Sequence, residues 1–168
     1  MHRDHRPDVL ASALLSAFVL ATTAFAAGPG AKGKPDPWIE RGRYVVAIGG
    51  CSDCHTPGYA ENGGKADEKV LLTGDILGWH GPWGTTYPGN LRLFMQNLTE
   101  REWIKAARKM RARPPMPFWA LNRMGTGDLR AVYRYIRSLG PAGGPAPDFE
   151  PPGTMPKPPY VQFPAPPK

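Results

Sequence analysis

Apolar side chains recur at helical spacing in three stretches of the chain. The first follows Asp36-Pro37, and this pair is typical of an N-cap residue with proline at the first helical position. It predicts a helix over residues 38–48. Gly42 costs stability inside a helix, so we expect a second helix to cross closely there. Four apolar side chains are expected on the buried side of the helix: Ile39, Tyr44, Val45 and Ile48.

The second stretch begins at Thr99, and Glu102 three residues later completes the sequence of a capping box. A helix over residues 99–112 is expected, because Arg113-Pro114-Pro115 stops it. Its apolar face carries Trp103, Ile104, Ala107 and Met110. In the third stretch Thr126 is expected to cap a helix over residues 127–139. The inner stripe of this helix carries Leu129, Val132, Tyr133 and Ile136.

The segments between these stretches lack a helical period. Residues 56–75 are polar and are expected to form a loop, and residues 79–84 are aromatic and turn-forming. From residue 141 the chain is dense in proline. We expect no regular element in this tail, 141–168, which either packs on the domain in extended form or is disordered.

The first 26 residues are typical of a secretory signal peptide. Arg3 and Arg6 precede an apolar run, and Ala24-Phe25-Ala26 matches a cleavage site. An anchor that is retained is the alternative, because the apolar run is just long enough to span a bilayer. The expected organisation is a signal peptide over 1–26, a flexible leader over 27–35, one domain over 36–140 and the tail.

One motif carries chemistry. Cys51-Ser52-Asp53-Cys54-His55 has the C-x-x-C-H spacing of a c-type haem attachment site. On a helical turn Cys51 and His55 share one face, with Cys54 close by. The two sulfurs can form thioethers with the two vinyl groups of one porphyrin, and the imidazole of His55 can bind its iron. Export agrees with this chemistry, because haem thioethers are made outside the bacterial cytoplasm.

A C-x-x-C pair has two other common uses. A thioredoxin-like redox pair follows a strand in a βαβ pattern, and no such pattern is present. A zinc site needs more ligands, and the chain contains two cysteines in all. The expected cofactor is therefore one covalently bound haem c. The indole rings of Trp79 and Trp83 can cover its apolar face and donate to a propionate, with ordinary packing as the alternative.

The sixth iron ligand is expected to be a methionine. Met116 lies between Pro115 and Pro117, and proline rigidity helps to hold a weak thioether on iron. Met124 and His80 remain alternatives, as does an open site. Ligation by His55 and Met116 would raise the reduction potential and close the iron to small ligands.

The formal net charge of +7 limits the partners. Many basic residues lie between Arg92 and Arg113. No aromatic-basic stacking motif indicates nucleic acid, so we expect redox partner proteins with an acidic docking face. A solvated helix face is the alternative. Membrane association is expected only through a partner or an uncleaved signal.

These features together resemble class I cytochrome c. A helix leads into the C-x-x-C-H motif, loops follow, and a methionine precedes a final amphipathic helix. The helix with Gly42 and Tyr44 resembles the N-terminal helix of that family, which crosses the C-terminal helix near Tyr133. The resemblance implies an all-α cytochrome c fold, with three to four helices around one covalently bound haem and an irregular proline-rich tail.

A narrower resemblance is carried by residues 81–87, Asn90-Leu91 and Met116-Pro117. They are similar to the cytochrome subunits of membrane-bound periplasmic alcohol, aldehyde and gluconate dehydrogenases. Those subunits carry several haem domains, whereas this chain has one haem motif. They also usually have Thr-Pro-Asp where this chain has Arg92-Leu93-Phe94.

The expected function is that of a periplasmic c-type cytochrome rather than an enzyme. It would carry single electrons, through a His/Met-ligated haem c, between a dehydrogenase and the respiratory chain. The first alternative is a small haem peroxidase or sulfur-compound oxidase with an open sixth site. The second is a structural or sensory haem module whose tail docks onto a partner.

Overall fold

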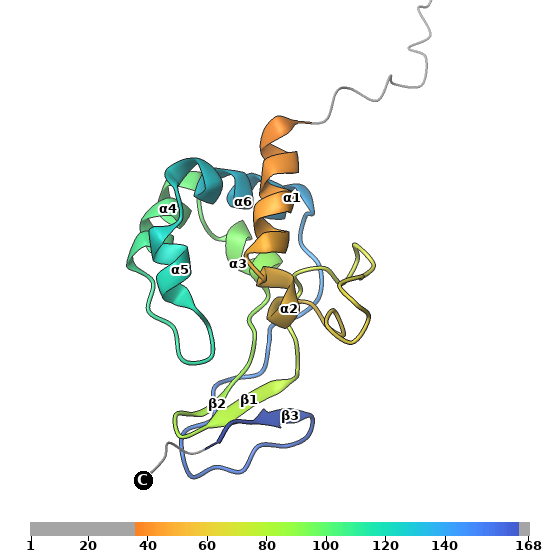
Figure 1. Ribbon diagram of the computed structural model, residues 1–168, viewed down its shortest axis with the longest axis vertical. Helices are drawn as coiled ribbons and strands as arrows, with labels where there is room; N and C mark the ends of the chain where they lie inside the picture. The colour runs from red at the N-terminus through yellow and green to blue at the C-terminus, as the bar shows by residue number, and fades with distance from the viewer. Residues whose placement is uncertain (1–35, 165–168) are drawn as a thin grey trace, which may run out of the picture. The chain divides into compact units, whose positions relative to one another are not determined.

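The computed structural model describes residues 36–164, which form six helices and three short strands (Figure 1). The predicted signal peptide, the predicted leader and the last four residues of the tail lie outside the described residues. Among residues 36–164 none of the helices has the length and apolar character needed to cross a membrane.

Helices α1 (Pro37–Ile48) and α6 (Thr126–Ser138) pack against each other. The carboxylate of Asp36 accepts the N–H of Trp38 at 2.8 Å and caps α1, as predicted. A methyl group at Gly42 would overlap the carbonyl of Ala131 and lie 2.6 Å from Cβ of Tyr135. The close helix crossing expected at Gly42 is therefore confirmed.

The buried face of α1 differs from the expectation at two positions. Tyr44 is 53% exposed and Ile48 is 65% exposed, so the prediction that both are buried was wrong. Helix α6 instead covers the face that carries Gly42, Val45 and Val46, at i, i+3 and i+4. Tyr44 and Ile48 are four residues apart on a neighbouring face, which the sequence pattern did not separate from the first.

Three further helices are α3 (Leu91–Gln96), α4 (Glu100–Lys109) and α5 (Phe118–Arg123). The capping box of Thr99 and Glu102 is confirmed, but α4 ends at Lys109, three residues earlier than predicted. Buried Trp103 donates its indole N–H to the carbonyl of Leu129 at 2.7 Å and so joins α4 to α6.

The predicted cap of the last helix was wrong. The N-cap of α6 is Gly125, which has no side chain to cap the helix. The hydroxyl of Thr126 instead accepts a hydrogen bond from Arg108 of α4 at 2.9 Å. The side chains buried on α6 are Leu129, Ala131, Val132, Tyr135 and Ile136.

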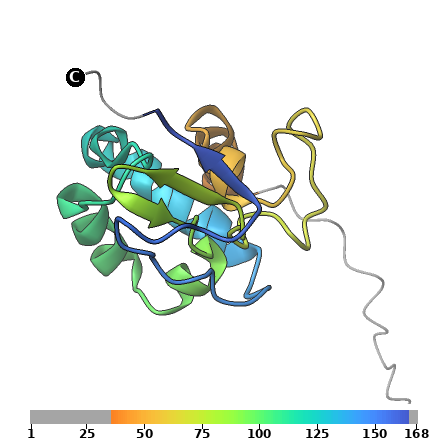
Figure 2. The same ribbon diagram turned by 90° about the horizontal axis from the view of Figure 1, so that it is seen from below.

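A three-stranded sheet was not predicted. Strands β1 (Gly78–Gly81) and β2 (Gly84–Thr86) form an antiparallel hairpin. Strand β3 (Tyr160–Gln162) adds to β1 in parallel, so the strand order is β2-β1-β3 (Figure 2). The expectation that the proline-rich tail has no regular element was therefore wrong. The cytochrome c fold itself stays a prediction.

Asn90 and Arg92 tie α3 to distant parts of the chain. The Asn90 side chain accepts the N–H of Leu93 at 3.0 Å and caps α3. Arg92 is 5% exposed and has only carbonyl partners: it donates to Glu68 at 2.8 Å, to Gly140 at 2.6 Å and to Leu139. The guanidinium thus satisfies carbonyls at the end of α6, where a cation is favourable.

Candidate functional site

A cavity with a volume of about 1230 Å³ lies among the described residues. Its lining residues come from the end of α1, the motif helix α2 (Cys51–His55), the loop before α3, helices α3 to α6 and the tail. Most of them are apolar, among them Leu91, Leu121, Val132 and Ile136. Ligand pockets are usually about 300–1,000 Å³, so this cavity accommodates a large, mainly apolar group.

Helix α2 brings the motif to the wall of this cavity. It begins after Gly50, whose φ of +64° suits glycine and turns the chain sharply out of α1. Cys51 and Cys54 are free thiols, are half-buried and both line the cavity. Burial, with a smaller effect of Asp53, raises the pKa of Cys51 to about 11, so this thiol is protonated at neutral pH.

His55 lines the same cavity. Its Nδ1 lies 2.7 Å from the carbonyl oxygen of Gly89, a geometry in which Nδ1 carries the proton and donates it. Nε2 is then the nitrogen with a free lone pair. Burial lowers the pKa of His55, and the hydrogen bond to Gly89 opposes this only in part, so the ring is neutral at pH 7. A neutral imidazole with its second nitrogen held by a carbonyl is the usual form of a metal ligand.

Four methionines line the cavity: Met95, Met110, Met116 and Met124. Met155 lies in the tail, is 74% exposed and does not line it. Met116 belongs to an irregular loop, where its N–H donates to Arg113 at 3.3 Å and its carbonyl accepts from Phe118 at 2.9 Å. The structure brings Met116 and Met124 to the same cavity as His55, and the choice between them stays a prediction.

The two tryptophans of the hairpin differ in position. Trp79 lines the cavity, and its buried indole Nε1 has no hydrogen-bond partner among the described residues. Trp83 is not among the lining residues; it donates to the carbonyl of Trp79 at 3.3 Å and packs on Phe163. His80 does not line the cavity either. Its Nδ1 lies 2.8 Å from the hydroxyl oxygen of Thr85.

The donor set fits a haem. Two thiols, one imidazole and several thioethers meet at one apolar cavity, and the buried indole N–H of the lining residue Trp79 has no acceptor among the described residues. A bare metal ion has no comparable site, because residues 36–164 contain no group of three His, Cys, Asp or Glu side chains that could hold one.

Sequence reasoning missed several residues of this site. The carbonyl of Gly89 has no signal in the sequence, because every residue has a carbonyl group. Arg111 and Arg113 line the cavity from the loop after α4, whereas the sequence placed them at the end of a helix. Pro145 and Ala146 of the tail also line it. The proline-rich composition of the tail indicated no such contact.

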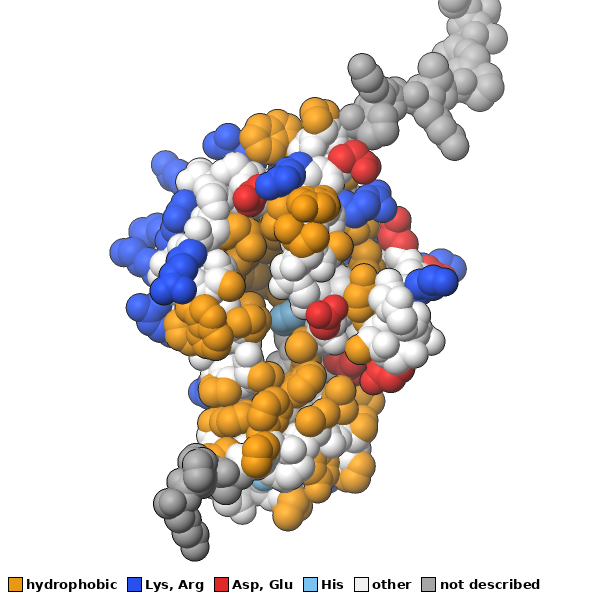
Figure 3. Space-filling view, viewed as in Figure 1, with side chains coloured by type: hydrophobic (Ala, Val, Ile, Leu, Met, Phe, Trp, Pro, Cys, Tyr) orange, Lys and Arg blue, Asp and Glu red, His pale blue; other side chains and the backbone are white. Residues whose placement is uncertain are grey.

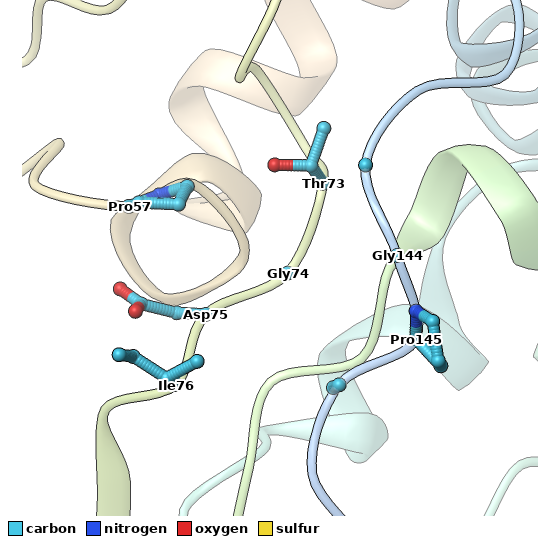
Figure 4. Close-up of a pocket in the computed structure, with 9 residues that line it drawn as sticks. Pro57, Thr73, Gly74, Asp75, Ile76, Gly144 and Pro145 are labelled. Carbon is cyan, nitrogen blue, oxygen red and sulfur yellow. The ribbon is translucent and has the colours of Figure 1, made fainter.

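A second cavity, of about 330 Å³, lies behind that tail segment (Figure 4). Pro145 and Ala146 line both cavities, so this part of the tail separates them. The smaller cavity is lined mainly by glycine, proline and apolar side chains. Its one carboxylate, of Asp75, accepts the N–H of Leu77 at 3.1 Å. Nothing in this set indicates a bound group.

Basic side chains gather on one side of the molecule. Figure 3 shows Lys and Arg side chains over the α4 side of the hollowed face. Those that are exposed on α4, on α5 and in the loop between them are Arg101, Lys105, Arg108, Lys109, Arg111, Arg113 and Arg123. We call these seven side chains the basic patch.

Comparison with known proteins gives two relatives. The chain is 29% identical over 153 residues to the fructose dehydrogenase cytochrome subunit of Gluconobacter japonicus, a match that covers 79% of this chain and 30% of that protein. It is 32% identical over 120 residues to one of the subunits of nicotinate dehydrogenase from Pseudomonas putida, covering 65% of this chain and 9% of that protein. No family model and no solved structure matches.

The chain thus spans less than a third of the length of either relative. Both relatives are subunits of dehydrogenases, and one is by name a cytochrome subunit. The resemblance to the cytochrome subunits of dehydrogenases, predicted from the sequence, is confirmed at this low level of identity. A cytochrome relative implies a haem, in agreement with the donor set of the cavity.

Proposed function

We propose that this chain is an exported, periplasmic c-type cytochrome that carries single electrons between a dehydrogenase and the respiratory chain. One haem would be bound covalently to Cys51 and Cys54, with His55 and Met116 as the axial ligands. One observation carries the proposal: a single apolar cavity joins both thiols and the imidazole of the motif to a methionine held in a proline-rich loop.

The chain's own residues have defined tasks in this proposal. Helix α2 presents the two thiols at the cavity wall, where each S–H would add across one vinyl group to form a thioether. The carbonyl of Gly89 fixes the orientation of the His55 ring and leaves Nε2 for iron. The indole N–H of Trp79 supplies a donor for a propionate. A bound haem would supply the one-electron couple of its iron.

Met116 is the favoured sixth ligand among the four methionines of the cavity. Met95 is only 1% exposed and belongs to the packed core. Met110 and Met124 pack against that core. Met116 lies in a loop between prolines, where few core contacts compete for its sulfur. A methionine ligand raises the potential and closes the iron, which suits electron transfer.

The partner would be a redox protein, as for the dehydrogenase subunits that this chain resembles. The basic patch supports an acidic docking face on that partner, because opposite charges speed the encounter of two proteins. Arg111 and Arg113 belong both to the patch and to the cavity lining, so a partner bound there would come close to the haem.

The competing function is that of a haem enzyme with an open sixth site. Such an enzyme needs a free iron position and a polar group beside it to handle protons. His80 was the candidate for that group, but it does not line the cavity and its Nδ1 faces Thr85. The methionines at the cavity favour the electron carrier.

Carbon monoxide separates the two functions. Reduced holoprotein with two axial ligands should bind carbon monoxide slowly or not at all, whereas Met116→Ala should bind it readily and lose the weak far-red band of thioether bound to ferric iron. Met124→Ala is the matched control and should behave as the wild type. Fast binding to the reduced wild type would support the enzyme instead, and a reversal of the two variants would assign the ligand to Met124.

A further inference from the structure

The C-terminal segment, which we define as residues 141–164, is built into the wall of the cavity. The side chain of Asn90 donates to the carbonyls of Ala142 at 2.8 Å and of Gly144 at 3.0 Å, next to the residues that line the cavity. Further along, Glu150 and Thr85 exchange two backbone hydrogen bonds, of 2.8 and 3.0 Å. The segment therefore follows the cavity from α3 to the sheet.

Strand β3 fixes the end of this segment against β1. The N–H of Gly78 donates to Pro159 at 3.0 Å, and the N–H of Phe163 donates to His80 at 2.8 Å. In this register Val161 lies opposite Trp79. Because side chains alternate along a strand, Phe163 lies on the same face of the sheet as Trp79.

Phe163 packs on both tryptophans. Its ring centre lies 5.9 Å from that of Trp79, at an angle of 49°, and 5.2 Å from that of Trp83, at 62°. Both distances lie within the range of favourable aromatic pairs. Phe163 thus packs against Trp79, a lining residue whose indole N–H has no partner among the described residues.

Phe149 makes a similar contact with Arg113. The guanidinium carbon of Arg113 lies 3.8 Å from the centre of the Phe149 ring, a close cation–π contact. Arg113 lines the cavity, and no carboxylate lies within 4.0 Å of it in the described part of the chain. The hydroxyl of Thr86 donates to the carbonyl of Pro114 at 2.6 Å, which fixes this loop to the strand beside Trp79.

We propose that Phe149 and Phe163 are positioning residues which hold Arg113 and Trp79 as donors for the carboxylates of the bound cofactor, and that the C-terminal segment thereby raises its reduction potential. This inference rests on the proposed haem. Donors that neutralise a propionate destabilise ferric iron relative to ferrous iron. Loss of such a donor therefore favours the oxidised state and lowers the potential.

The test is the midpoint potential of purified holoprotein, measured by spectroelectrochemistry for Phe163→Ala, Trp79→Phe and the double variant. Each single variant should reduce the equilibrium constant for reduction, by up to about tenfold, or about 59 mV for one electron. The double variant should show no larger loss than Trp79→Phe alone, because Phe163 acts through Trp79. In the same way, Phe149→Ala combined with Arg113→Gln should lower the potential no further than Arg113→Gln alone.

Two controls separate positioning from simple loss of stability. Phe163→Leu keeps an apolar side chain at the position and should recover most of the potential. Gln162→Ala changes an exposed residue of the same strand, opposite His80 on the other face of the sheet, and should leave the potential unchanged. If Phe163→Ala gives no holoprotein, Phe149→Ala and Trp79→Phe decide.

Wild-type potentials in Phe163→Ala and Phe149→Ala holoprotein would overturn the positioning role and leave the proposed function standing. So would a double variant whose loss is the sum of the two single losses. A wild-type protein that carries no haem would instead refute the proposed function itself. The two failures are therefore distinguished by the haem content of the wild type.

Discussion

The crossing of α1 and α6 gives a prediction whose size follows from the structure. In Gly42→Ala the new methyl group would overlap the carbonyl of Ala131 and lie 2.6 Å from Cβ of Tyr135. Neither neighbour can rotate away, because one is backbone and the other is the first atom of a side chain. The two helices must therefore separate, which loosens the packing of Val45 and Val46.

Overpacking of this kind costs about 1–3 kcal/mol, and backbone neighbours place Gly42 at the upper end of that range. Alanine in place of glycine returns about 1 kcal/mol through helix propensity. The net loss of unfolding free energy is therefore about 2 kcal/mol. For a domain of this size it corresponds to a decrease of Tm by about 6–8 °C.

Gly127 provides the matched control. It lies in the partner helix α6, but a methyl group there meets nothing within 4 Å. Gly127→Ala should therefore stabilise the protein slightly, by less than about 1 kcal/mol. Thermal unfolding of both holoprotein variants, followed by far-ultraviolet circular dichroism, measures the two effects. An unchanged or raised Tm for Gly42→Ala would refute the close crossing, and equal losses in both variants would mean that the loss is not specific to the crossing of α1 and α6.

Three further predictions concern the haem, the patch and pH. Cys54→Ala should lose most holoprotein, measured as haem absorbance per polypeptide, because one thioether is left; full haem content would make Cys54 dispensable. Lys105→Glu with Lys109→Glu should slow electron transfer from the donor and weaken its dependence on salt while the haem spectrum is unchanged, since the Debye length is about 8 Å at physiological ionic strength. A rate that changes neither with salt nor with the charge reversal would mean that α4 is a solvated face and not a docking site. Burial acts to raise the pKa of Glu100, but hydrogen bonds and charges of two α6 arginines lower it overall. Glu100→Gln should therefore cost about 0.5–1 kcal/mol at neutral pH, and the difference from wild type should vanish as the pH falls below the ordinary pKa of 4.5 and through the lowered one. A difference that persists at low pH would assign the loss to packing.

The parts of the fold that the sequence predicted correctly depend on neighbouring residues. Asp36 caps the helix that it precedes, and Thr99 and Glu102 form a capping box within one turn. Gly42 differs from these caps. A glycine lowers the stability of a helix, and its presence there is commonly explained by the close approach of another helix. Each cap and the helix end that it stabilises lie within a few residues of each other. The loss of helix stability at Gly42 can be recognised from the glycine itself.

The parts that were missed depend on which distant element covers a given face. Tyr44 and Ile48 are apolar, but α6 lies on the adjacent face of α1 and leaves them exposed. Helices α3 and α5 have six residues each, too few to show a period. Strand β3 has three residues, and its place beside β1 is a long-range contact without a local signal.

The candidate site divides in the same way. The C-x-x-C-H motif specifies its chemistry locally, so Cys51, Cys54 and His55 could be chosen from the sequence. That these residues share one cavity with four methionines became clear only from the fold. The contributions of Gly89 and Phe163 could not be predicted, because a carbonyl acceptor and an aromatic contact between distant parts of the chain leave no pattern in the sequence.

The central claim is one haem bound covalently through Cys51 and Cys54. The most direct measurement is the intact mass of the protein, purified from a host with the cytochrome c maturation machinery and denatured before analysis. The expected mass is that of the exported chain plus one haem, which is retained under denaturing conditions and lost in Cys51→Ala with Cys54→Ala. A mass equal to that of the bare chain, from a host in which a control cytochrome c is loaded, would contradict it.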